Sequence, residues 1–84
     1  MKTTREKIGD LAASVMLLAQ NSGLSWDEVV AALGLVSNGL AVAASSEGGG
    51  SREECLELAR KRLEEAMRQE VQVIFGPNSI SLAH

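Results

Sequence analysis

The sequence is poor in the residues that most often carry chemistry or cross-link a small fold. It holds 1 Cys, 1 His, 1 Trp, 1 Phe and no Tyr among its 84 residues. The single cysteine, Cys55, excludes an internal disulfide, and the one histidine, His84, leaves no usual set of zinc ligands. We therefore expect no catalytic site, no metal and no cofactor, and we expect Cys55 to be a small residue at the edge of a core.

The hydrophobic residues that are present are nearly all aliphatic. They make up 45% of the chain, while aromatic residues make up 2%. Aliphatic side chains are the usual filling of helix interfaces. A chain of this length forms one domain, over residues 1–84, with a small core, and without disulfides or metals its common support is oligomerisation. The sequence therefore predicts a homodimer.

The charge balance is acidic, with 8 Lys and Arg against 11 Asp and Glu and a net charge of -3. Nucleic-acid-binding proteins usually present a basic field, so this balance argues against a nucleic-acid partner. Glu6 and Asp10 precede the apolar run Leu11–Ala19, which argues against a signal peptide. The uncharged run Val29–Ser46 contains several Gly and Ser, so we expect a buried helix rather than a membrane helix. These features predict a cytoplasmic protein with no membrane contact.

Hydrophobic periodicity and helix-capping signals predict a mainly α fold of three to four helices. Gly34 could end the second helical region, or the helix could continue to about Ala44. The "SNG" at Ser37–Gly39 favours a break there, because Gly is a weak helix former. The helices are expected near 4–20, 26–44 and 52–70, each after a capping box: Thr3 with Glu6, Ser25 with Glu28, and Ser51 with Glu54.

The last expected helix is amphipathic. Its charged residues include the i,i+4 pairs Glu57–Lys61 and Glu64–Arg68, which are typical of a solvated helix face. Its apolar stripe is expected to contain Leu56, Ala59, Leu63, Ala66 and Met67.

Two segments outside these helices have their own signals. "SSEGGGS" at 45–51 has the composition of a flexible Gly/Ser loop. In the tail, apolar and polar residues alternate on both sides of a "GPN" turn signal, which predicts a two-stranded β-hairpin over 71–84. The alternative for the tail is a helix that continues to Ile74. A lone hairpin is marginal in water, so it would have to lie on the helices or on another subunit.

The stretch around Gly34 resembles the helix-turn-helix family over about 20 residues. Gly34 matches the turn glycine of that family, and Val30 departs from it, because the family favours a small residue there. The positions that would face DNA offer only Ser37 and Asn38 as polar groups, whereas bases and phosphates are read mainly by Arg, Lys, Asn and Gln. The inner apolar positions of the pattern are matched by Val29, Leu33, Leu35, Leu40 and Ala43.

We therefore predict a non-catalytic helical interaction or regulatory module that homodimerises and binds another, unidentified protein. The alternative is a helix-turn-helix-like, DNA-binding transcriptional regulator. The interface is predicted on the apolar second region and on the stripe of the last helix. Its residues are Val36, Leu40, Ala41, Val42, Leu56 and Leu63.

Overall fold

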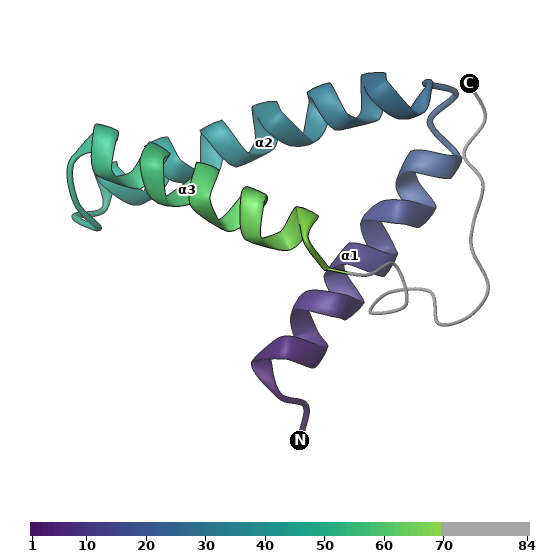
Figure 1. Cartoon of the computed structure of the whole chain (residues 1–84), viewed down its shortest axis with the longest axis horizontal. Helices are drawn as coiled ribbons and strands as arrows, with labels where there is room; N and C mark the ends of the chain where they lie inside the picture. Colours follow the sequence, from purple (N-terminus) through teal and green to yellow (C-terminus); the bar gives the residue numbers. More distant parts are fainter. Residues whose placement is uncertain (70–84) are drawn as a thin grey trace. The chain divides into compact units, whose positions relative to one another are not determined.

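The computed structural model describes residues 1–69 and contains three α-helices in that range (Figure 1). They are α1 (Thr4–Gln20), α2 (Trp26–Ser46) and α3 (Arg52–Met67). The prediction of a mainly helical fold is confirmed, and the helix bounds differ from the predicted ones by a few residues. The β-hairpin predicted over 71–84 lies outside the described residues.

The chain divides into two compact units, which separate within the first turn of α2. Among the described residues, the first unit contains Met1–Val29 and therefore α1. The second unit contains Val30–Gln69, and we call it the α2–α3 hairpin. The whole chain as one domain, over residues 1–84, stays a prediction.

In the first unit, α1 begins at the predicted capping box. The backbone N–H of Glu6 donates to the Thr3 hydroxyl at 3.1 Å, and the Thr3 N–H donates back to the Glu6 carboxylate at 3.1 Å. Two N–H groups that have no partner inside the helix are satisfied in this way. Ala19 and Val29 are the buried hydrophobic residues of this unit among the residues described.

The start of α2 corrects one detail of the predicted capping. The Ser25 N–H donates to the Glu28 carboxylate at 2.9 Å, which is one half of the expected box. The Ser25 hydroxyl does not complete it, because it donates to the Asp27 carboxylate at 2.6 Å instead. Asp27 and Glu28 still place negative charge at the positive end of the helix dipole, so the helix begins where the sequence predicted.

α2 is continuous over 21 residues, so the predicted break at Ser37–Gly39 is wrong. The turn that a helix-turn-helix motif needs at Gly34 is also absent from this helix. Neither Gly34 nor Gly39 has a positive φ, and the Ser37 hydroxyl donates within the helix to the Leu33 carbonyl at 2.8 Å. Two glycines cost about 1 kcal/mol each relative to Ala, which does not outweigh an otherwise unbroken helical run without Pro.

A hydrogen-bonded turn joins α2 to α3. The Gly49 N–H donates to the Ala44 carbonyl at 2.9 Å, and the Gly48 N–H donates to the Ser45 carbonyl at 3.2 Å. This pair of bonds is the Schellman motif, in which a left-handed residue ends a helix, and Gly48 has a φ of 87°. Ser45 and Ser46 belong to α2, so the loop predicted over 45–51 begins later than expected.

α3 begins at the complete Ser51–Glu54 capping box, as predicted. The predicted Glu64–Arg68 pair is present at 2.7 Å, whereas Glu57 pairs with Arg60 at 3.6 Å rather than with Lys61. All of these charged groups are well exposed, so each pair stabilises the helix by a few tenths of a kcal/mol. The charged residues thus form a solvated face, and the apolar residues of α3 are left for packing.

Candidate interaction surface

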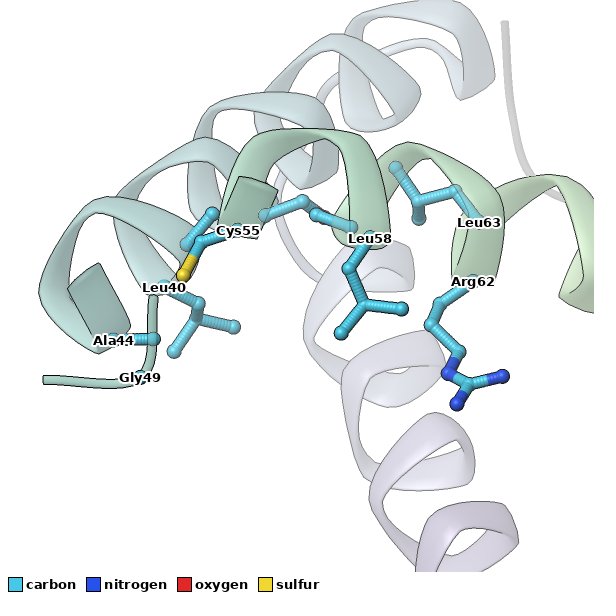
Figure 2. A pocket seen from close by; sticks show the side chains of 10 residues that line it. Leu40, Ala44, Gly49, Cys55, Leu58, Arg62 and Leu63 are labelled. Atoms are coloured by element: carbon cyan, nitrogen blue, oxygen red, sulfur yellow. The ribbon is translucent and has the colours of Figure 1, made fainter. Parts of the chain in front are cut away.

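A hollow of about 420 Å³ lies between the two helices of the α2–α3 hairpin (Figure 2). Small residues of α2 and leucines of α3 form most of its wall. Its only charged wall residue is Arg62. The lining residues are Ser37, Leu40, Ala41 and Ala44 from α2, Gly49 from the turn, and Cys55, Leu58, Ala59, Arg62 and Leu63 from α3.

The spacing of these residues follows from the helical repeat. The α2 residues recur at i, i+3, i+4 and i+7, and the α3 residues recur at i, i+3, i+4, i+7 and i+8, so each set lies along one side of its helix. The turn closes the hollow near Ala44 and Cys55, because the two helices run in opposite directions from it. The hollow is therefore the seam between two antiparallel helices.

Packing along this seam is thin. Ala41 is 5% exposed, and it is the one buried hydrophobic residue of the hairpin among the residues described. The Ser37 hydroxyl is satisfied by the Leu33 carbonyl, so it brings no free polar group to the seam. Because Ala41 is small, its burial removes little apolar area from water. The hairpin thus has a seam but almost no core of its own.

Two leucines at the seam remain largely exposed. Leu40 is 68% exposed and Leu58 is 51% exposed, and both project to the same side of the hairpin, together with Arg62 (Figure 2). Leu33 lies seven residues before Leu40, and Val36 lies four residues before it. Ala43 lies three residues after Leu40, so all of these residues continue the same side along α2. We call this surface side A: Leu33, Val36, Leu40, Ala43 and Leu58.

Leu63 also lines the hollow, but its side chain points away from the direction that Leu58 and Arg62 take (Figure 2). Leu56 lies seven residues before it and Met67 four residues after it, so all three residues share one face of α3. Leu63 is 44% exposed, and Met67 is more exposed still. We call this surface side B: Leu56, Leu63 and Met67.

The six residues of the predicted interface do not form one surface. Val36 and Leu40 lie on side A, and Leu56 and Leu63 lie on side B. Ala41 packs inside the hairpin, so it is not available to another chain. Consecutive residues of a helix are about 100° apart, so Leu40 and Val42 lie on opposite flanks of Ala41, and Val42 is half-buried on the flank towards side B. The hydrophobic character of these positions was visible in the sequence, but their division between two sides needed the position of α3.

Sequence reasoning missed Leu58 and Arg62, which contribute to the seam. The predicted stripe ran through Leu56 and Ala59, and the seam runs instead through Cys55, Leu58 and Ala59. The i, i+3, i+4 spacing from Cys55 could have revealed it, because α3 carries apolar residues on both sides of that line. The expectation that Cys55 lies at the edge of a core agrees with its partial burial in the hollow.

The one charged residue in the wall of the hollow has an ion-pair partner, and two carboxylates at helix starts have lowered pKa values. Arg62 forms an ion pair with Glu65 at 2.9 Å. At the start of α3, the hydrogen bond from the Ser51 N–H lowers the pKa of the Glu54 carboxyl below its ordinary value of 4.5. The Ser25 N–H lowers the pKa of Glu28 in the same way. Both carboxylates are thus held in the charged form by helix capping, and neither is arranged as a proton donor.

Two general properties complete the description of the surface. Within residues 1–69 no three His, Cys, Asp or Glu side chains come together as a possible metal site. α2 is long and apolar enough to cross a membrane, judged by length and composition alone, and few of its side chains are buried.

Comparison with models of protein families, with curated proteins and with solved structures finds no match.

Proposed function

We propose that this protein is a non-catalytic helical interaction module that self-associates and binds another protein. One observation carries the proposal: the α2–α3 hairpin buries a single hydrophobic residue, Ala41, while Val36, Leu40, Leu58 and Leu63 remain exposed. Exposed apolar surface of this extent, gathered on both sides of one hairpin, is typical of a protein–protein contact.

The energetics support a contact with another chain. Ordering a residue costs about 1–2 kcal/mol of backbone entropy. Burial of one alanine offsets only a small part of this cost along the hairpin. Complete burial of an exposed Leu or Val stabilises by about 1.5–3 kcal/mol. Covering Val36, Leu40 and Leu58 would therefore add several kcal/mol to the stability of the hairpin.

The two apolar sides support two different contacts. Side A takes residues from both α2 and α3, while side B takes its residues from α3 alone. Because they lie on opposite sides of the hairpin, one partner can occupy each without excluding the other. This arrangement supports a module that binds a second copy and also binds another protein.

The competing explanation for the apolar surface is a membrane. α2 is about 30 Å long, which matches the hydrocarbon thickness of a bilayer. However, α3 lies along α2 from Ser37 to Ala44 and carries charged residues throughout its length. Insertion of α2 would require α3 to detach or would bring these charges into lipid, at a high cost. We therefore propose a cytoplasmic protein whose apolar surface meets protein.

Sedimentation equilibrium of the full chain over a range of micromolar concentrations tests this proposal. We expect a mass that increases from monomer to dimer with concentration. A monomer at every concentration, together with a cooperative thermal transition, would contradict self-association. Proteins captured from lysate on the immobilised chain then need confirmation by direct titration, with a variant of side B, Leu63→Glu, as the comparison.

A further inference from the structure

Side A is apolar along α2 and carries no net charge along α3. From Val29 to Ser46, α2 has no Asp, Glu, Lys or Arg. On α3, the helical repeat places Glu54, Lys61, Arg62 and Glu65 beside Leu58, so two acids stand with two bases. Arg62 and Glu65 already pair with each other at 2.9 Å. The surface therefore selects neither a basic partner nor an acidic one.

The spacing of the α2 residues on side A matches a helix-pairing seam. Leu33, Val36, Leu40 and Ala43 are separated by three, four and three residues. This is the spacing of the a and d positions of a heptad, in which the side chains of one helix pack between those of a facing helix. α3 does not cover this line, because Leu33, Val36, Leu40 and Ala43 are all exposed.

We infer that side A is the site where a second copy of this chain packs, so that two α2–α3 hairpins form a four-helix bundle. This inference rests on the self-association proposed above and names its surface. A two-fold symmetric contact brings the same patch of both copies together, and a neutral apolar patch is complementary to itself. Nucleic acid or an acidic lipid surface would find no matching charge on side A.

Side B is the weaker candidate for this contact. Its residues come from one helix, and Leu56 is already half-buried. On the same side of α2, Leu35 and Val42 alternate with the polar Asn38 and Ser45, so this side has no continuous apolar line like that of side A. On side A, by contrast, Leu40 and Leu58 project together from two helices beside the hollow. A second copy that covers them completes a core with side chains from four helices.

The bundle makes folding of the hairpin depend on association. Because Ala41 is the only buried hydrophobic residue of the hairpin described, most of its core forms when the second copy binds. The midpoint of thermal unfolding should then increase with protein concentration, as it does when association and folding are coupled.

The test compares glutamate substitutions on three faces of the hairpin, each made in the full-length protein. Sedimentation equilibrium measures association, and circular dichroism measures helix content. Leu40→Glu and Val36→Glu place a carboxylate on side A. Leu35→Glu is the matched control, because Leu35 is 77% exposed and lies on the flank of the same helix opposite Leu40, outside side A. Leu63→Glu tests side B. We expect both side A variants to dimerise at least about a hundredfold more weakly than the parent, because an unpaired charge is buried. Leu35→Glu and Leu63→Glu should dimerise like the parent.

A side A glutamate variant that loses its helix content is also informative, because coupled folding predicts this loss at low concentration. Leu40→Ala then separates the two effects: it should keep its helices at high concentration and dissociate at a higher concentration than the parent does. A parent dimer whose side A variants associate normally, or a dimer broken by Leu63→Glu instead, would overturn the inference but leave self-association intact. A monomeric parent would defeat the proposed self-association itself.

Discussion

The Ala44 carbonyl oxygen accepts the N–H of Gly49 at 2.9 Å and would lie 3.0 Å from a Cβ atom at the same glycine. A side chain at Gly49 therefore requires the turn to shift. The neighbouring glycines are constrained differently, since Gly48 and Gly50 have φ angles of 87° and 134°. Each residue of the Gly triplet thus has its own reason to lack a side chain. The composition suggested a flexible loop, and the structure shows a turn with defined geometry.

Replacement of Gly48 by Ala should therefore destabilise the protein, by about 1–2 kcal/mol, because a left-handed conformation is unfavourable for residues with a Cβ. Thermal or urea unfolding measures the loss. Gly34→Ala is the control, because Gly34 lies inside α2 with nothing within 4 Å of its added methyl group. It should stabilise by up to about 1 kcal/mol, through helix propensity. Equal stabilities of the two variants would show that the turn geometry is not required.

Ala41→Glu should disrupt the hairpin rather than only its association. Ala41 is 5% exposed and lines the seam opposite α3, so the carboxylate would lose its water without gaining a partner. We expect circular dichroism to show a large loss of helix or of thermal stability at all concentrations. Ala31→Glu places the same side chain on an exposed position of the same helix and should retain the parent fold. A stable Ala41→Glu hairpin would mean that α3 does not pack there.

The capping carboxylates predict a specific pH dependence. The folded-state pKa of Glu54 lies below its ordinary value of 4.5, so the folded state binds fewer protons than the unfolded chain near that pH. The contribution of the Glu54 carboxylate to the stability of the folded protein is therefore present above about pH 4.5. It is lost as the pH falls through the folded-state pKa of Glu54. The stability difference between the parent and Glu54→Gln should shrink in acid, as followed by urea unfolding at several pH values. Glu53→Gln, whose carboxylate accepts no bond from Ser51, is the control. A difference that does not change with pH would rule out the capping contribution.

The parent should show no salt-dependent binding to duplex DNA. α2 continues through Gly34 and Gly39, so no turn presents a separate reading helix, and its outward positions carry no Lys or Arg. Titration of mixed-sequence DNA at low and moderate salt measures this, because phosphate binding weakens steeply as salt increases. Affinity that falls in this way would revive the alternative function, and Lys2, Arg5, Lys7 and Asn38 would then be the residues to substitute.

The parent should also remain separate from lipid vesicles in a flotation assay. α2 has the length and composition of a membrane span, but α3 holds charged residues alongside it. Vesicles of neutral and acidic lipid should both leave the chain in the unbound fraction. Stable flotation with neutral vesicles would show that α2 separates from α3 and enters the bilayer.

The sequence predicted the helices well, because their ends depend on local chemistry. Thr3 with Glu6 and Ser51 with Glu54 form the expected capping boxes, since each box involves residues only three apart. The break at Ser37–Gly39 was wrong because glycine propensity is a small energy in a long uninterrupted helix. The capping box predicted at Ser25 is only half formed, because the nearby Asp27 carboxylate accepts the hydrogen bond of the Ser25 hydroxyl.

The surfaces were harder to predict than the helices. Val36, Leu40, Ala41 and Val42 are all apolar in sequence, yet they point in three directions: to side A, to the seam and to the opposite flank of α2. Their roles depend on which side of α2 faces α3, and that depends on a turn between the two helices. Leu58 was missed for the same reason. A hydrophobic pattern shows that a helix packs, whereas the direction of packing requires the neighbouring helix.

The tight turn also restricts how this hairpin could change in length during evolution. One residue inserted between Cys55 and Leu58 would rotate the rest of α3 by about 100° and carry Leu58 away from Leu40. Seven residues span nearly two full turns, so an insertion of seven would restore its direction to within about 20°. An insertion of seven residues would then also be needed in α2, so that α2 has two further turns that pack against those added to α3. We would expect relatives of this protein to differ by paired steps of seven residues, with the three glycines between the helices retained.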